Sequence, residues 1–204
     1  MNIYKAFIAL ALLLSASPTQ SQSVPTQAWK ITFGSFGLDL SKHDTLTPAL
    51  FNKFIARVVP GSPGMTCFTN GTLMRIEMFD ELKIIDRTKG VCYLIDTALK
   101  ESRTKKDMGA ENIQPQLFDD TVTIAGYVCK EAVFKTATLI PEDELIVWYT
   151  PLLPPLYDDQ SAFLQRLHGC VLASGVYNKV RKTFMGGKAT AVRAVIVDRR
   201  IFTP

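Results

Sequence analysis

The sequence predicts an α+β fold made mostly of antiparallel β-structure: a strongly curved sheet, an open half-barrel, covered by one or two helices. After residue 64, apolar and polar residues alternate in successive short runs, which is the pattern of half-buried strands. The links between these runs are short and rich in turn-forming residues. One amphipathic segment precedes them, and no βαβ rhythm occurs. About eight or nine strands result, and a sheet of that size curls because its strands twist.

The N-terminus has the pattern of an export signal. Lys5 precedes an apolar run over residues 6–14, and small or polar residues follow. The run is shorter than the roughly 20 residues that span a bilayer. We therefore expect a cleaved signal peptide over residues 1–22, no stable membrane span afterwards, and a periplasmic or secreted protein. The first cysteine is Cys67, so no lipid-attachment cysteine is expected. Residues 23–204 are expected to form a single curved-sheet domain.

The first mature elements are a strand and a helix. Residues 28–38 alternate in hydrophobicity and contain glycines that allow a bend. Thr47 can cap a helix whose first position is Pro48, and apolar residues then recur at helical spacing up to Val59. One apolar face along this helix predicts that it covers the sheet.

Hairpins follow the helix. Asn70-Gly71 is a strong two-residue turn signal, and residues 86–90 form a second turn. Residues 100–116 lose the apolar rhythm and are expected to be a loop with a frayed strand end.

The C-terminal half contains strands from residue 121, then a rigid proline-rich exit over residues 151–155. Asp158 or Asp159 is expected to cap a short helix that ends at Gly169. Two further strands, 170–177 and 190–202, are expected on either side of Gly186-Gly187.

Several motifs lie on these strands. They are Met74-Arg75-Ile76-Glu77; Asp86, Gly90, Tyr93 and Asp96; Gly126, Tyr127, Cys129, Lys130 and Ala132; Val147-Trp148-Tyr149-Thr150; and Leu167, Gly169 and Leu172. Together they resemble exported bacterial envelope proteins with the lipoprotein-carrier (LolA/LolB-like) fold, related to the GLPGLI-type family. The family's glycine-leucine-isoleucine core is replaced here by Gly169-Cys170-Val171, which favours a sister group.

The four cysteines allow either buried thiols or one or two disulfides. The resemblance implies that Cys92 and Cys129 lie on neighbouring central strands, and hence a Cys92–Cys129 disulfide. It implies no catalytic residue.

The sequence lacks the common catalytic signatures. It has no G-x-S-x-G, no phosphate-binding glycine loop, two histidines and no zinc-ligand spacing. Its acidic pairs fall at predicted turns, and its basic residues are scattered rather than aligned for nucleic acid. We therefore expect no enzyme activity, no metal, no cofactor and no nucleic-acid partner.

The positive functional signal is apolar. Candidate residues to line a space between sheet and helix are Phe33, Phe36, Phe54, Met74, Met78, Trp148 and Tyr149. Trp148 and Tyr149 are adjacent on a strand, so one of them must face away. Two interpretations remain open: a cavity that binds a lipid, a lipidated molecule or another apolar ligand, and a filled core whose surface docks another envelope protein. A hydrolase is the third alternative.

Overall fold

The computed structural model describes residues 24–43, 45–98, 101–107, 113–135 and 143–204. The predicted signal peptide lies outside the described residues. None of the described helices is long and apolar enough to cross a membrane.

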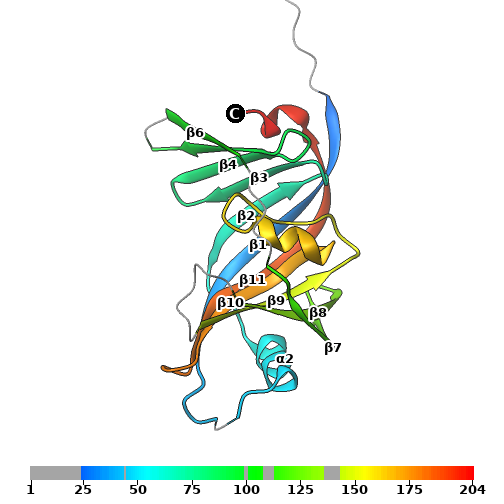
Figure 1. The fold of residues 1–204 in the computed structure, drawn as a ribbon. Coiled ribbons are helices and arrows are strands. Elements are labelled where there is room, and N and C mark those ends of the chain that lie inside the picture. Colours follow the sequence, from blue (N-terminus) through cyan, green and yellow to red (C-terminus); the bar gives the residue numbers. More distant parts are fainter. Residues whose placement is uncertain (1–23, 44, 99–100, 108–112, 136–142) are drawn as a thin grey trace, which may run out of the picture.

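One eleven-stranded sheet organises the chain (Figure 1). Its strands are β1 (Pro25–Asp39), β2 (Pro63–Thr69), β3 (Leu73–Met78), β4 (Glu81–Asp86), β5 (Val91–Asp96), β6 (Glu101–Asp107), β7 (Gln116–Ile124), β8 (Tyr127–Phe134), β9 (Asp143–Thr150), β10 (Cys170–Asn178) and β11 (Thr183–Asp198). The helices are α2 (Pro48–Arg57) and the 3-10 helices η1 (Ala162–Leu167) and η2 (Arg199–Phe202).

The strand order is β6-β5-β4-β3-β2-β1-β11-β10-β9-β8-β7, and every pair of neighbouring strands is antiparallel. Two meanders meet at the long strands β1 and β11, which pair with each other. Pro25 lies opposite Asp198 at one end of this pairing, and Asp39 lies opposite Thr183 at the other. The sheet stays open, with β6 and β7 at its edges. This confirms the predicted fold class, with more strands than the sequence indicates.

One additional strand comes from residues 100–116, which were expected to be a loop with a frayed strand end. That prediction is wrong for β6, which pairs with β5. The strand reads E-S-R-T-K-K-D and has no apolar alternation. Its edge position explains the difference, because charged residues suit a strand whose outer edge must not recruit another chain.

The Gly186-Gly187 pair also lies elsewhere than predicted. It falls inside β11 rather than between two strands, and the turn before β11 includes Lys182 at a φ of 50°. A Cβ atom at Gly186 would collide with the carbonyl oxygen of Ser174 on β10. The glycine is therefore required by the close approach of two strands, not by a turn.

Helix α2 begins as predicted. The Thr47 hydroxyl accepts a hydrogen bond from the Leu50 amide at 3.3 Å, and Pro48 occupies the first turn. The helix ends at Arg57, two residues before the predicted Val59. Val59 precedes Pro60, and the residue before a proline is disfavoured in helical conformation.

The two helices α2 and η1 cover opposite faces of the β8–β10 region. Trp148 packs against Phe184, whose ring also contacts Phe51 of α2. Its neighbour Tyr149 belongs instead to the cluster formed with η1, to which this helix contributes Phe163, Leu164 and Leu167. The alternation of adjacent strand residues thus separates two packed layers.

The expected Cys92–Cys129 disulfide is not present. All four cysteines are free and buried. Cys92 lies on β5 and Cys129 on β8, and these strands are not neighbours, contrary to the layout that suggested the pairing. Burial raises the pKa of the Cys92, Cys129 and Cys170 thiols to about 12, so they behave as small apolar groups.

Candidate functional site

Helix α2 seals the face that it covers. Phe51 packs edge-on against Tyr177 and Phe184, and Ile55 is fully buried. The Trp148 indole donates a hydrogen bond to Asn52 Oδ1 at 2.6 Å. Because these contacts are direct, the space predicted between the sheet and this helix is filled by side chains.

An apolar cavity lies on the other side, between the sheet and residues 155–167, which we call the roof segment. Its volume is about 240 Å³. We call it the inner cavity. The lining residues are Phe33, Met65, Cys67 and Ile76 from β1–β3, Leu145, Val171, Ser174 and Gly187 from β9–β11, and Leu156, Tyr157, Asp158, Ser161 and Leu164 from the roof segment.

Small residues keep this cavity open. Gly187 and Ser174 are cross-strand partners in its lining. A Cβ atom built on Gly187 would approach nothing closer than the Gly34 carbonyl oxygen, at 3.9 Å. The space above Gly187 is therefore unfilled rather than closed by backbone packing.

Arg87 holds one end of the roof segment. Its guanidinium donates to the Gly71 carbonyl oxygen at 2.8 Å and to the Pro155 carbonyl oxygen. It also lies 4.3 Å from the centroid of the Tyr157 ring, a cation–π contact. One half-buried cation thus ties the start of the roof to the β2–β3 turn.

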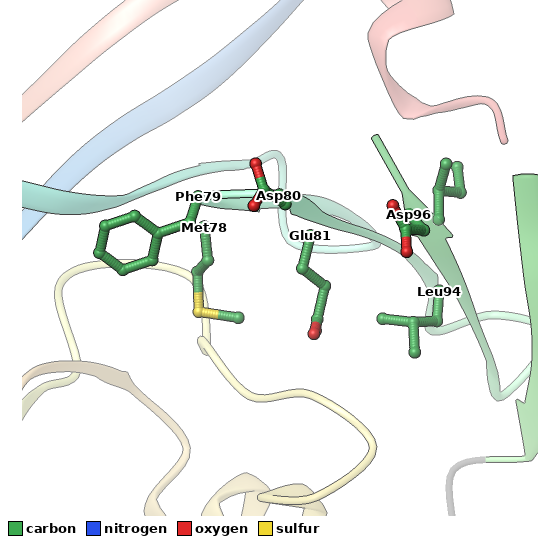
Figure 2. Close-up of a pocket in the computed structure, with 7 residues that line it drawn as sticks. Met78, Phe79, Asp80, Glu81, Leu94 and Asp96 are labelled. Atoms are coloured by element: carbon green, nitrogen blue, oxygen red, sulfur yellow. The ribbon is translucent and has the colours of Figure 1, made fainter. Parts of the chain in front are cut away.

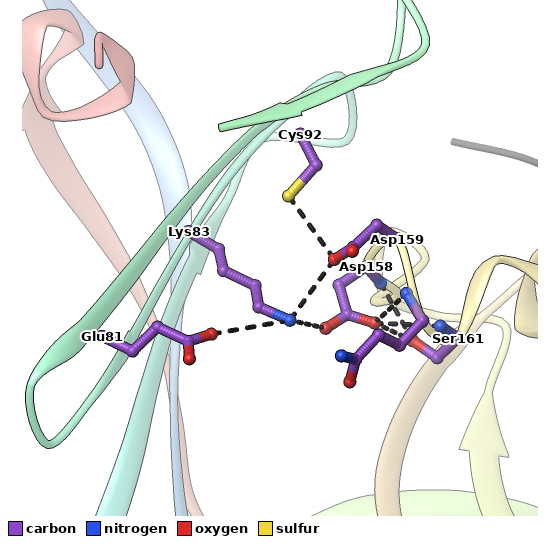
Figure 3. A network of polar contacts seen from close by, with 7 residues as sticks. Glu81, Lys83, Cys92, Asp158, Asp159 and Ser161 are labelled. Atoms are coloured by element: carbon purple, nitrogen blue, oxygen red, sulfur yellow. Dashed lines mark hydrogen bonds and ion pairs between the residues drawn. The ribbon is translucent and has the colours of Figure 1, made fainter. Parts of the chain in front are cut away.

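Lys83 holds the middle of the roof through an ion cluster (Figure 3). Its Nζ atom lies 2.6 Å from Asp158 Oδ2, 3.3 Å from Asp159 Oδ1 and 3.7 Å from Glu81 Oε1. The Lys83 side chain is 5% exposed. Asp158 Oδ1 in turn accepts hydrogen bonds from the Ser161 amide and hydroxyl. Within the described residues, no group of histidine, cysteine and acidic side chains could hold a metal ion.

The charges in this cluster support one another. Burial disfavours the charged form of Lys83, but Asp158 and Asp159 outweigh it and raise the pKa of the ammonium. Burial likewise opposes ionisation of Asp158, yet its bonds to Lys83 and Ser161 lower the pKa of that carboxyl. Lys83 and Asp158 are therefore both ionised at neutral pH.

A second hollow opens at the β3–β4 turn, and we call it the outer hollow (Figure 2). Its volume is about 450 Å³, and it is lined by Met78, Phe79, Asp80, Glu81, Leu94, Ile95 and Asp96. Phe79 is 93% exposed and adopts a left-handed conformation with a φ of 40°. An exposed aromatic ring at a strained turn position is uncommon, and such positions concentrate at binding sites.

The structure separates the seven predicted lining residues. Phe33 lines the inner cavity and Met78 the outer hollow. The other five make packing contacts: Phe36 against Phe184, Phe54 against His43, Met74 and Trp148 fully buried, and Tyr149 in the η1 cluster. As predicted, Trp148 and Tyr149 face opposite sides. Their role in binding remains a prediction.

Sequence reasoning treated Asp158-Asp159 as a helix cap and gave Lys83 no role. The cap prediction is wrong, because the N-cap of η1 is Ser161; Asp158 accepts amide hydrogen bonds from Gln160 and Ser161 in the turn before the helix. The available signal for Lys83 was a lone lysine flanked by apolar residues in the run Leu82-Lys83-Ile84-Ile85, where a buried charge requires a partner.

Comparisons with known proteins support the fold alone. No protein-family model matches the chain, and no curated protein matches it. Membership in the GLPGLI-type family therefore stays a prediction. The structure of PNGF-II in space group C2 is similar, with a TM-score of 0.55 and 15% identity over 87% of this chain and 30% of that one. The P21 form gives a TM-score of 0.54 and 15% identity over 88% and 31%.

This chain thus spans about 30% of PNGF-II. A domain from Vibrio parahaemolyticus, described as belonging to an outer membrane lipoprotein-sorting protein, was also found. It has a TM-score of 0.34 and 10% identity over 86% of this chain and 89% of that one. A score this low carries no argument about this chain.

Proposed function

We propose that this chain is a non-catalytic binding protein of the bacterial envelope that holds an apolar ligand, such as an acyl chain, in the inner cavity. The observation that carries the proposal is the apolar cavity between the sheet and an anchored roof segment. The signal-like N-terminal sequence supports export. Each buried methylene contributes about 0.8 kcal/mol, so about six methylenes would contribute roughly 5 kcal/mol without any specific polar contact.

The polar groups at the cavity favour binding over catalysis. The Ser161 hydroxyl donates to Asp158, and Asp158 is bonded to Lys83, which superficially suggests a nucleophile with a base. A general base must be able to accept a proton near neutral pH. The pKa of Lys83 is raised and that of Asp158 is lowered, so neither group is suited to that task.

The proposal is tested by filling the cavity from its floor. Gly187→Leu is expected to weaken binding of the neutral fluorescent probe N-phenyl-1-naphthylamine by about tenfold or more, because the new side chain takes up space worth at least two methylenes. The measurement is fluorescence titration of the purified protein, together with native mass spectrometry for co-purified apolar compounds.

Gly37→Leu is the matched control. A Cβ atom at Gly37 meets nothing within 4 Å, and Gly37 does not line the inner cavity. This variant should bind the probe like the wild type, and both variants should keep their thermal midpoints. A wild-type protein that binds no neutral apolar probe, or a Gly187→Leu variant that binds as well as wild type, would overturn the proposed function.

A further inference from the structure

The inner cavity is small, and its size limits the ligand. Its volume of about 240 Å³ lies below the roughly 300–1,000 Å³ of typical ligand sites. An apolar cavity of about 150 Å³ holds benzene, which has six carbon atoms. By the same proportion, the inner cavity holds about ten non-hydrogen atoms. A membrane lipid has several times as many atoms and would leave most of its apolar surface in water.

Buried side chains form most of the cavity wall. Cys67 is fully buried, and Ile76 and Val171 are 6% and 5% exposed. Burial raises the pKa of the Cys67 thiol, which therefore stays neutral and acts as a small apolar group. Leu156 and Leu164 of the roof segment are buried as well. An alkyl chain that fills the cavity cannot extend through walls packed in this way.

The roof segment is anchored, so the cavity does not deepen easily for a longer chain. Lys83 Nζ lies 2.6 Å from Asp158 Oδ2, and both side chains are largely buried (Figure 3). Half-buried Arg87 donates to the Pro155 carbonyl oxygen and packs over the Tyr157 ring. Lifting the roof would separate a desolvated ion pair, which is costly.

Ser174 offers a hydrogen-bonding group to a ligand. Ser174 is the cross-strand partner of Gly187, and side chains of such partners point to the same face of the sheet. The space above Gly187 is unfilled, so the Ser174 side chain borders it. Within the described residues, the Ser174 hydroxyl makes no hydrogen bond, and the residue is half-buried. A hydroxyl can both donate to a ligand and accept from it.

The lining disfavours a charged end group. No lysine or arginine is among the described residues that line the cavity, so a carboxylate would lose hydration without gaining a cation. The charged lining residue is Asp158, whose two oxygens are already bonded to Lys83 and Ser161. An ammonium group would have to compete with Lys83 for that carboxylate. A neutral end group avoids both costs.

We propose that the ligand of the inner cavity is a neutral, unbranched molecule of about seven to nine carbons whose single hydroxyl or carbonyl group hydrogen-bonds to Ser174. This inference rests on the proposed function and adds the ligand's size and end group.

Straight-chain primary alcohols from butanol to dodecanol test the size limit. Each is used below its solubility limit to displace N-phenyl-1-naphthylamine from the full chain, since the ten-carbon naphthyl ring of this probe matches the cavity in size. We expect the affinity to rise about fourfold per methylene up to octanol. From decanol onward it should stay flat or fall, because further methylenes remain in water. A fourfold rise that continues through dodecanol would overturn the size limit.

Three eight-carbon compounds test the end group. Octanol is expected to bind at least tenfold more tightly than octanoate or octylammonium at pH 7.4, because each ion loses hydration without a free partner in the lining. Equal or tighter binding of either ion would overturn the neutral assignment.

Ser174→Ala tests where the end group lies. This variant should lower the ratio of octanol affinity to toluene affinity by about fivefold, since toluene cannot use the lost hydrogen bond. Ser35→Ala is the matched control: Ser35 is the partner of Gly187 on β1, but it is exposed and does not line the cavity. It should keep the wild-type ratio, and thermal midpoints confirm that both variants are folded. An unchanged ratio in Ser174→Ala, or an equal loss in Ser35→Ala, would overturn the assignment to Ser174.

The outcomes separate the two proposals. If the size or end-group results fail while the probe binds and Gly187→Leu weakens it, this inference is overturned and the proposed function stands. If the probe, the alcohols and toluene all fail to bind, the proposed function itself is overturned.

Discussion

Lys83→Met is expected to lower the free energy of unfolding by about 3–5 kcal/mol at pH 7. The Lys83 ammonium is the charge partner of Asp158 and Asp159, whose side chains are 17% and 9% exposed. Removing it takes this ammonium away from two carboxylates that are themselves largely desolvated, which destabilises their charged forms. The roof segment should detach more readily, since this contact bridges residues 75 positions apart. Urea unfolding followed by tryptophan fluorescence measures the change.

Lys89→Met is the matched control for this variant. Lys89 pairs with Asp86 at 3.1 Å, but its side chain is 71% exposed, so the same substitution should cost less than about 1 kcal/mol. If the two variants lose equal stability, the Lys83 cluster is not a buried ionic anchor.

The pH dependence provides a second check on Lys83. The pKa of Asp158 is lowered in the folded protein, so its contribution is present above its unfolded pKa near 4 and is lost as the pH falls through the folded pKa. The difference between wild type and Lys83→Met should therefore shrink below pH 4. A difference that persists unchanged at pH 2.5 would indicate lost packing of the lysine stem rather than lost charge pairing.

Local chemistry made several elements predictable. At Asn70-Gly71 the turn is encoded within four residues: Gly71 takes a φ of 97°, and Asn70 Oδ1 accepts from the amides of Thr72 and Leu73. The start of α2 at Thr47-Pro48 is encoded in the same local way. Period-two hydrophobicity also predicted that Trp148 and Tyr149 face opposite layers.

The site depends on long-range pairing, which local patterns do not specify. The inner cavity combines β1–β3 with β9–β11 and exists because β1 pairs with β11 across almost the whole chain. Gly187 could not be recognised as its floor while Gly186-Gly187 was interpreted as a turn. The amphipathic pattern of α2 predicted a covering helix, but the pattern does not specify which face of the sheet it covers or how closely it packs.

Glu131 is expected to make stability fall as the pH rises from 5 to 8. This carboxyl lies on β8 opposite Trp148 and is 1% exposed, and its Oε2 atom has no hydrogen-bond partner among the described residues. Burial, with a smaller contribution from the charge of Asp120, raises its pKa from 4.5 to about 8. The folded protein therefore keeps a proton that the unfolded chain releases.

The sign follows from proton linkage. Between pH 4.5 and 8 the native state binds more protons than the unfolded state, so the free energy of unfolding decreases with pH. One pKa unit corresponds to 1.36 kcal/mol, which gives a loss of roughly 3–4 kcal/mol from pH 5 to pH 8. Glu131→Gln removes the titrating group and should abolish most of this slope. Urea unfolding of wild type and variant at half-unit pH intervals measures it.

Glu77→Gln provides the matched control, because Glu77 is 43% exposed and bonded to Arg75 on the protein surface. This variant should retain the wild-type slope. The interval ends at pH 8 to exclude a second effect, which comes from the buried thiols. Their pKa values are raised to about 12 in the folded protein, so above pH 8 the unfolded chain loses thiol protons that the folded protein keeps, and this also lowers stability. A wild-type protein whose stability is flat from pH 5 to 8, or a Glu131→Gln variant with the full wild-type slope, would show that the folded state does not hold Glu131 neutral. The carboxylate beside Trp148 would then have to be solvated or paired, and the α2-covered face would be less tightly closed than its packing indicates.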